Sequence, residues 1–273
     1  MVARGGAGAV LSVIRVVPET GSTNADLLEL VRAGAADEGL WLRAEQQTAG
    51  RGRQGRVWIS PVGNFYASTV VRLRPGDPNA ATLGFVAAVA LEAVVATLLP
   101  SRLREEAAER RSGLPIGSCP SPTPPADGKR GLLKWPNDLL IDGAKLSGIL
   151  LERAGDAVIV GIGVNVAHHP DLPDRRTTSV AAQGVQIGPG AFAERLAASF
   201  AEWLARWREQ GFGAIRARWL DRAHAPGTPL RAALPDGSTV AGVFEDLDAD
   251  GALILRLASG ERRAIHAGDV FLV

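Results

Sequence analysis

Short apolar runs and longer amphipathic segments alternate along the first 224 residues of the chain. The short runs lie next to glycines or Asn-Asp pairs and predict strands over residues 40–44, 65–73, 132–135, 139–141, 147–152 and 158–166. Apolar residues recur at threes and fours from Phe192 to Trp207, which predicts an amphipathic helix over residues 191–208. Shorter helices are expected over residues 25–33 and 213–222. Together these elements predict a mixed sheet covered by helices.

The most apolar stretch of the chain covers residues 83–99. Glu92 stands near its middle and Pro100 ends it. At about 1.5 Å per residue a helix of this length is shorter than the roughly 30 Å hydrocarbon core of a membrane. We therefore expect a buried helix of a soluble protein, and no membrane partner.

The character of the chain changes after His224. Residues 229–273 contain five short β-like runs separated by turn sequences, which is typical of a small, strongly bent β-barrel. The expected fold class is α+β, with one domain over residues 1–224 and a second over residues 225–273. Residues 102–131 are first charged and then rich in Pro, Ser and Gly, so we expect a disordered insertion in the first domain.

Composition narrows the function. The 30 Lys and Arg residues nearly balance the 29 Asp and Glu residues, which excludes a protein that coats polyanions. The single cysteine, Cys119, excludes a disulfide framework and fits a reducing compartment, and no targeting segment is recognisable, so a cytoplasmic location is expected. Only three residues are lysine against 27 arginines. A lysine in this chain therefore suggests a need for a compact, deprotonable charge.

The clearest candidate for chemistry is the loop from Gly50 to Arg56, followed by Trp58. Three glycines let the backbone approach a ligand closely, and three arginines suit phosphate and carboxylate oxygens. The loop is not a P-loop, because no Gly-Lys-Ser/Thr follows. An RGG-like nucleic-acid segment or a plain charged loop is the alternative.

Two further motifs follow. Lys134-Trp135-Pro136-Asn137-Asp138 precedes Lys145 by a few residues, and this places two of the three lysines close together; the alternative is a simple Asn-Asp turn. The run from Gly161 to Asn165 lacks the third glycine of a dinucleotide fingerprint. Asn165 on an apolar strand needs partners, from a nucleotide or from the protein itself.

Taken in order, these motifs resemble those of one family, the biotin protein ligases. The resemblance covers residues 16 to 273 apart from the insertion. It is carried by the following stretches: Ser22-Thr23-Asn24, residues 45–56 with Trp58, Asn64-Phe65-Tyr66, residues 134–138, residues 145–150 and residues 161–165. It implies a catalytic domain like that of class II aminoacyl-tRNA synthetases, followed by an SH3-like barrel.

The resemblance also implies an activity. ATP and biotin give biotinyl-5′-AMP, with Mg²⁺ as cofactor, and a lysine of a biotin carboxyl carrier protein or domain then takes the biotinyl group. The implied catalytic residues are Lys145, Arg53 and Asp138. Biotin would be bound by Ser22, Thr23, Asn24, Gln47, Arg51, Gly52, Arg53 and Lys145. The nucleotide would be bound by Arg56, Trp58, Lys134, Asp138 and Asn165. No residue is assigned as a metal ligand.

Some members of the family carry an N-terminal DNA-binding domain. About twenty residues precede Ser22 here, so ligase activity without DNA binding is expected, and a homodimer is allowed. A lipoate or octanoate ligase or transferase of the same fold is the alternative enzyme. An RNA-binding module that uses the Arg-Gly loop is the alternative of another class, and it leaves the segment from Lys134 to Lys145 unexplained.

Overall fold

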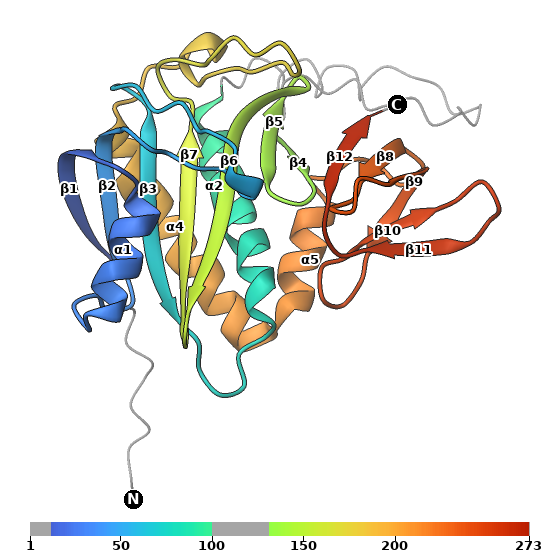
Figure 1. The fold of residues 1–273 in the computed structure, drawn as a ribbon, viewed down its shortest axis with the longest axis horizontal. Coiled ribbons are helices and arrows are strands. Elements are labelled where there is room, and N and C mark those ends of the chain that lie inside the picture. Colours follow the sequence, from blue (N-terminus) through green and yellow to red (C-terminus); the bar gives the residue numbers. More distant parts are fainter. Residues whose placement is uncertain (1–11, 100–130, 273) are drawn as a thin grey trace, which may run out of the picture.

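A seven-stranded sheet forms the centre of the larger domain in the computed structural model, which describes residues 12–99 and 131–272 (Figure 1). The strand order is β1-β2-β3-β7-β6-β5-β4, with β1 parallel to β2 and every other pair antiparallel. The strands are β1 (Val13–Thr20), β2 (Leu40–Gln47), β3 (Phe65–Arg72), β4 (Gly131–Lys134), β5 (Asp138–Ile141), β6 (Ala144–Ala154) and β7 (Ala157–Val164).

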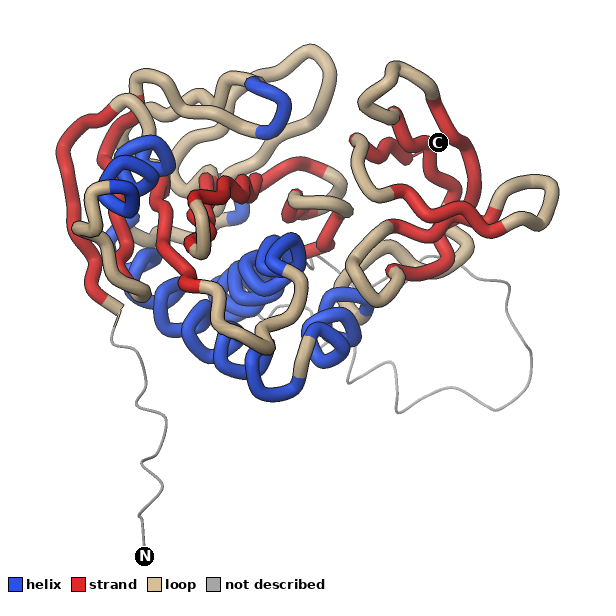
Figure 2. The backbone as a smooth tube through the Cα atoms, turned by 60° about the horizontal axis from the view of Figure 1, so that its bottom comes forward, coloured by secondary structure: helices blue, strands red, loops and turns tan. Residues whose placement is uncertain are grey.

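Helices cover both faces of this sheet, as Figures 1 and 2 show. Strand β7 explains why, because successive side chains of a strand point to opposite faces. Val158, Val160 and Ile162 face the main core, which contains α2 (Leu83–Leu98), α4 (Pro189–Gln210) and α5 (Phe212–Leu220). Ile159 faces the other side and packs with Leu27 of α1 (Thr23–Arg32). The described part of the domain also contains three short 3₁₀ turns: η1 (Arg53–Gly55), η2 (Ala80–Thr82) and η3 (Ala181–Gln183).

Helix α2 is the central element of the core. With η2 it is long and apolar enough to cross a membrane, but 72% of its apolar window is buried inside the protein. Polar contacts tie it to α4: Ser199 Oγ donates to the carbonyl of Ala90 at 3.0 Å, and Trp207 Nε1 donates to Thr82 Oγ1 at 2.7 Å. The prediction of a buried helix over residues 83–99 is therefore confirmed.

The smaller domain is a five-stranded antiparallel sheet in the order β11-β10-β9-β8-β12, at the right of Figure 1. Its strands are β8 (Pro229–Ala233), β9 (Thr239–Leu247), β10 (Leu253–Arg256), β11 (Arg262–Ile265) and β12 (Asp269–Leu272). Trp135 Nε1 donates to the carbonyl of Gly251 at 3.0 Å, and Arg216 Nε donates to that of Leu247 at 2.8 Å. Side chains of the large domain thus form hydrogen bonds with the backbone of the small one. The five strands predicted for the small domain are confirmed.

Three expectations need adjustment. Strand β1 was not among the predicted strands, because it is an edge strand with mostly exposed side chains and no alternating apolar pattern. Helix α1 begins at Thr23 rather than at residue 25, directly after Ser22 in extended conformation. The expected insertion over residues 102–131 lies outside the described residues except for Gly131, which is the first residue of β4.

Candidate functional site

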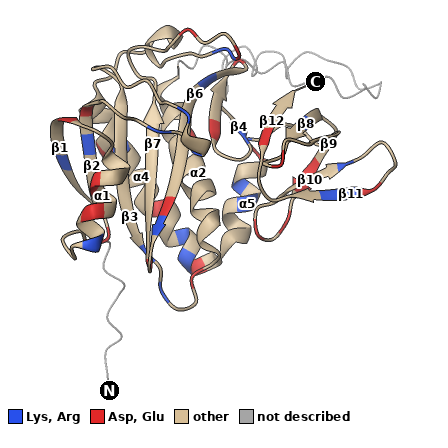
Figure 3. Cartoon of the chain, in the orientation of Figure 1, with Lys and Arg blue, Asp and Glu red and all other residues tan. Residues whose placement is uncertain are grey.

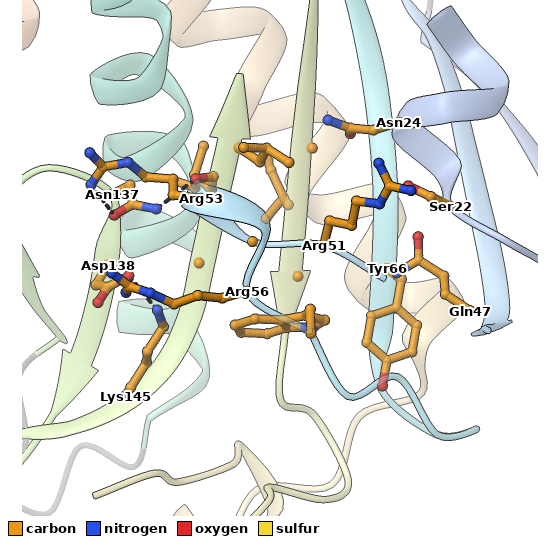
Figure 4. A pocket seen from close by; sticks show the side chains of 18 of the residues that line it. Ser22, Asn24, Gln47, Arg51, Arg53, Arg56, Tyr66, Asn137, Asp138 and Lys145 are labelled. Carbon is orange, nitrogen blue, oxygen red and sulfur yellow. Dashed lines mark hydrogen bonds and ion pairs between the residues drawn. The ribbon is translucent and has the colours of Figure 1, made fainter. Parts of the chain in front are cut away.

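A pocket of about 350 Å³ lies over the sheet (Figure 4). Asp269 and Phe271 of the small domain also line it. Side chains from the start of α1, the end of β2, the Gly50–Trp58 loop, the β4–β5 turn, β6, β7 and β12 line it. Twelve of the thirteen residues predicted for the site line this pocket: Ser22, Thr23, Asn24, Gln47, Arg51, Gly52, Arg53, Arg56, Trp58, Lys134, Asp138 and Lys145. The fold thus gathers motifs that lie more than 120 residues apart in the sequence.

Asn165 is the residue that the structure does not bring to the pocket. It is 2% exposed, and its side-chain amide donates to the carbonyl of Thr178 at 3.0 Å. Its backbone N–H donates to the carbonyl of Leu146, and its carbonyl accepts from Val180. Asn165 therefore finds its hydrogen-bond partners within the protein, which was the second of the two expectations for this buried amide.

One end of the pocket is built from neutral hydroxyls and amides, which we call the hydroxyl–amide end: Ser22, Thr23, Asn24 and Gln47. The first turn of α1 creates it. The backbone N–H of Thr23, unpaired within the helix, donates to Gln47 Oε1 at 2.9 Å. Gln47 Nε2 in turn donates to Ser60 Oγ at 3.2 Å. These four side chains present hydrogen-bonding groups without formal charge, and Figure 4 shows Arg51 beside Ser22.

The arginine loop folds back on itself. Gly52 N–H donates to the carbonyl of Arg56 at 2.7 Å, and Gln54 and Gly55 both adopt positive φ, 57° and 71°. At the loop tip this left-handed backbone brings Arg53 over the β4–β5 turn, where its Nη1 lies 3.5 Å from Asn137 Oδ1 and 3.2 Å from the carbonyl of Gly268. The loop therefore spans the pocket from the large domain to the small one.

Trp58 lies against the sheet where two strands carry glycine. A Cβ built on Gly163 of β7 would come within 2.7 Å of the Trp58 indole, and one on Gly148 of β6 within 3.2 Å. The indole Nε1 is buried and has no hydrogen-bond partner among the described residues. Because neither glycine has a side chain, the indole can lie directly against the two strands at the floor of the pocket, a position that we call its glycine seat.

The other end, which we call the charged end, centres on Lys145. Lys145 Nζ lies 2.6 Å from Asp138 Oδ1 and 5.6 Å from the centroid of the Trp58 ring. The backbone of Lys145 is fixed, because its N–H donates to the carbonyl of Arg176 and its carbonyl accepts from Thr178. Figure 4 shows Asp138 and Lys145 beside Arg56 and Arg53, away from Ser22 and Gln47.

Positive charge dominates the pocket but not the chain. Six cationic side chains and three carboxylates line it: Arg51, Arg53, Arg56, Lys134, Lys145 and Arg175, with Asp138, Asp174 and Asp269. Figure 3 shows that charges elsewhere are spread over both domains. Burial lowers the pKa of Lys134, with nearby cations adding to the effect and Asp138 opposing it, and burial also lowers the pKa of Arg53. An anionic ligand would relieve this repulsion.

Four charged or aromatic lining residues lie outside every motif that the sequence indicates: Asp174, Arg175, Asp269 and Phe271. Tyr66 lies in one of the motifs but had no predicted role at the site. Asp269 of β12 forms ion pairs with Arg56 and, at 3.7 Å, with Arg53. Lys134 Nζ lies 5.6 Å from the centroid of the Phe271 ring. These contacts join residues more than 130 positions apart, and a single Asp or Phe in a short strand carries no local pattern that marks it as part of a site.

The pocket does not provide a preformed cage for a metal ion. Among residues 12–99 and 131–272, no three His, Cys, Asp or Glu side chains are grouped so as to hold one. Asp138, Asp174 and Asp269 are each paired with a cation. This donor set fits an Mg²⁺ ion that enters with phosphate groups, since Mg²⁺ is usually bound by one or two carboxylates together with substrate phosphates and water.

Comparison with known proteins identifies the class. The model of the Biotin/lipoate A/B protein ligase family matches residues 16–166, and the model of the biotin protein ligase C-terminal domain matches residues 227–273. The first match covers more than half of the chain. The chain therefore belongs to the Biotin/lipoate A/B protein ligase family.

Individual relatives agree with this family. The chain is 39% identical to a biotin--[acetyl-CoA-carboxylase] ligase of Paracoccus denitrificans, over 94% of this chain and 99% of the relative. It is 34% identical to the ligase of the same name from Mycobacterium tuberculosis, over 97% and 91%. The fold is similar to that of a biotin protein ligase from Aquifex aeolicus solved with biotin and ATP, with a TM-score of 0.72, 23% identity and coverage of 95% and 99%.

Proposed function

We propose that this protein is a biotin–[biotin carboxyl carrier protein] ligase. It activates biotin with ATP as biotinyl-5′-AMP and transfers the biotinyl group to a lysine of a carrier protein or domain of an acyl-CoA carboxylase. The observation that carries the proposal is the division of one pocket into a neutral hydroxyl–amide end and a charged end with an excess of cations. Such a pocket suits a ligand that is uncharged at one end and carries at the other a carboxylate that becomes a mixed anhydride with a phosphate.

In the first step a carboxylate oxygen of biotin attacks the α-phosphorus of ATP, and the bond to pyrophosphate breaks. Both reactants are anions, so the site must supply positive charge at the point where they meet. Arg51, Arg53 and Lys145 line the pocket and are proposed to supply it. The 2.6 Å ion pair with Asp138 supports the position of the Lys145 ammonium before a ligand arrives.

The ligands would be held along the length of the pocket. Ser22 and Thr23 would hydrogen-bond the ureido ring of biotin, Asn24 and Gln47 would also belong to the biotin site, and Gly52 would allow close approach of the loop backbone. Trp58 would stack on the adenine, and Arg56 and Lys134 would face the phosphates. The shallow glycine seat of Trp58 supports its place, since a flat aromatic face is open to a second ring. Asn165 stays a prediction without support from its position.

In the second step the amine of the carrier lysine attacks the acyl carbon of biotinyl-5′-AMP. A C–N bond forms, the C–O bond to the phosphate breaks, and AMP leaves. Asp138 is proposed to stand beside the incoming amine and to accept its proton. Its carboxylate lines the pocket within reach of Lys145, which supports a place near the reacting carbonyl.

Mg²⁺ is proposed to enter with ATP and to neutralise phosphate charge when bound. The domain boundary is proposed near residue 224, because the model of the C-terminal domain begins its match at residue 227 and the other family model ends its match at residue 166. The cytoplasmic location, the absence of a DNA partner and a possible homodimer belong to the same proposal as expectations.

The decisive experiment is biotin-dependent exchange of labelled pyrophosphate into ATP by the purified protein. We expect exchange with biotin and Mg²⁺, none without biotin, and transfer of biotin to a purified carrier domain. Lipoate and octanoate serve as matched carboxylic acids. Exchange that depends on either of these instead of biotin would replace the proposal by a lipoate or octanoate enzyme. No exchange with any of them, together with salt-sensitive RNA binding, would favour the RNA-binding alternative.

A further inference from the structure

A carboxylate outside the pocket is linked to the hydroxyl–amide end by buried side chains. We propose that Glu152 is a positioning residue that fixes the direction of the Thr23 hydroxyl through Asn24 and Ser68, so that Thr23 accepts a hydrogen bond from the bound ligand. This rests on the proposed function, in which the ligand at this end is the ureido ring of biotin. Glu152 itself does not line the pocket.

The contacts form an unbroken chain. Asn24 Nδ2 lies 2.7 Å from Glu152 Oε2, Ser68 Oγ lies 2.5 Å from Asn24 Oδ1, and Thr23 Oγ1 lies 2.7 Å from Ser68 Oγ. Thr23, Asn24 and Ser68 are 4%, 5% and 0% exposed. Water therefore has little access to these three side chains, and each must find its hydrogen-bond partners within the protein.

The carboxylate at one end fixes the direction of every bond. An ionised carboxylate only accepts, so the NH₂ group of Asn24 faces Glu152 and its oxygen faces Ser68. The single hydroxyl proton of Ser68 then goes to Asn24 Oδ1. An oxygen–oxygen distance of 2.7 Å requires a proton between Ser68 and Thr23, and only the Thr23 hydroxyl can still supply one.

The direction of the Thr23 hydroxyl determines which hydrogen-bonding groups the pocket offers to a ligand. With its proton directed to Ser68, Thr23 Oγ1 offers only lone pairs to the pocket. Gln47 Oε1, 3.2 Å away, is the other acceptor within reach of the Thr23 hydroxyl proton, but Ser68 Oγ is closer at 2.7 Å and has already given its own proton to Asn24. Gln47 Oε1 also accepts from the Thr23 backbone N–H, while Gln47 Nε2 donates to Ser60. Two adjacent acceptors call for an N–H donor on the ligand. A ureido ring has two such donors, whereas the dithiolane ring of lipoate has none.

The packing of the sheet keeps Asn24 in place. Gly161 lies beneath the Asn24 amide, and a Cβ at this position would overlap that amide. Asn24 therefore sits directly on the sheet beside Ser68 of β3 and Glu152 of β6. The Asn24 amide plane therefore has little freedom to turn, so its NH₂ group stays toward Glu152 and its oxygen stays toward Ser68.

The test compares biotin binding by variants at both ends of this chain of bonds, measured by calorimetry without ATP. Glu152→Leu removes the acceptor, and we expect biotin affinity to fall about tenfold, the upper range for one hydrogen bond. Glu152→Gln keeps an acceptor oxygen and should stay within about threefold of wild type. Ser68→Ala cuts the chain, so adding Glu152→Leu to it should weaken binding no further. Glu202→Leu, on the exposed face of α4, is the control.

Two results would overturn the inference while the proposed function stands. One is biotin binding within twofold of wild type in Glu152→Leu, and the other is a full additional loss from Glu152→Leu in the Ser68→Ala background. Thermal melts accompany each variant, and Glu152→Ala replaces the leucine variant if that does not fold. Wild-type protein that binds no biotin would overturn both the proposed function and this inference, so the two failures are distinguishable.

Discussion

Two clusters of charged side chains in this protein hold their charges in opposite ways. In the first, which we call the Glu38 cluster (Glu38, Arg72, Arg74, Asp77 and Arg208), both oxygens of Glu38 accept from Arg208, at 2.8 and 2.7 Å. Arg74 adds a pair of 2.8 Å, and the Arg72 N–H donates to the same carboxylate. In the second, the charged end of the pocket, cations outnumber carboxylates by six to three across the whole pocket lining.

The difference separates a structural use of charge from a binding use. The bidentate pair joins Arg208 of α4 to Glu38, which lies just before β2, and the Arg72 N–H at the end of β3 binds the same carboxylate. The cluster therefore links these parts of the fold. The pocket keeps unneutralised cations close together, which costs stability and is typical of sites that await an anion. Variants in the two clusters should therefore affect different measurements.

The largest effect is expected at Lys145. Lys145→Gln and Lys145→Arg should both lower the rate of biotinyl-5′-AMP formation by about 10²-fold or more, as for the loss of one preorganised charge-stabilising group. Arginine should not rescue, because the planar guanidinium cannot place its charge where the compact ammonium sits between Asp138 and Trp58. Rapid-quench measurement of the adenylation half-reaction checks this, and thermal melts should change little.

Activity of Lys145→Arg close to that of wild type would show that any cation suffices, and would remove the argument from the scarcity of lysine. Full activity of both variants would contradict the proposed charged end altogether. A large drop in melting temperature would mean that the charged end also serves stability, and would break the contrast with the Glu38 cluster.

The second effect is expected at Glu38. Although burial alone would raise the pKa of Glu38, the Arg208 hydrogen bonds, the Arg72 N–H and the charges of Arg208 and Arg74 outweigh it and lower this pKa. Glu38→Gln should therefore reduce the free energy of unfolding by about 2 kcal/mol at neutral pH, less than the loss for a fully buried pair. Adenylation should stay within about twofold of wild type, since Glu38 does not line the pocket.

The lowered pKa of Glu38 determines how the stability difference between wild type and Glu38→Gln changes with pH. A lowered carboxyl pKa contributes stability that is present above the unfolded value of about 4.3 and is lost as pH falls through the folded value. Denaturant unfolding of wild type and Glu38→Gln at a series of pH values should show the difference intact near pH 7 and shrinking below about pH 4. A difference that grows in acid would contradict the lowered pKa.

The sequence predicted the pocket better than it predicted the edges of the fold. Motifs around Gly50–Arg56, Lys134–Asp138 and Lys145 carry residue types that few other roles require, so they were found. Strand β1 was missed, because an exposed edge strand needs no apolar alternation. The part of Asp269 was also missed, since its pairing with Arg53 and Arg56 depends on how the small domain meets the large one.

Asn165 and Glu152 show that residue type alone does not decide which partners a side chain meets in the fold. Asn165 stands out in the sequence as an amide on an apolar strand, yet its partners are the protein's own backbone. Glu152 resembles an ordinary solvated residue at the end of a strand, yet it faces the buried amide of Asn24. Residue type indicates what a side chain can do, whereas the packing of α1 on the sheet decides which side chain meets which.

The smallest effect tests whether the pocket can be damaged with no change of charge. Gly163→Ala would place a Cβ within 2.7 Å of the Trp58 indole, so the ring must leave its seat on the sheet. If Trp58 stacks on adenine as proposed, the KM for ATP should rise about tenfold, within the range measured for aromatic stacking on a base. Biotin affinity, measured without ATP, should change less than twofold, because Thr23 and Gln47 keep their contacts.

The matched control is Gly213→Ala in α5, where an added Cβ meets no atom within 4 Å and alanine favours the helix. Tryptophan fluorescence should report the displaced indole in Gly163→Ala and no change in the control. An unchanged KM for ATP despite a displaced Trp58 would remove this residue from the nucleotide site, and the cations of the charged end would then have to hold ATP alone. A raised KM for ATP with an unchanged melting temperature would instead extend the contrast between the clusters, because the pocket would then depend on the shape of its floor as well as on its charge.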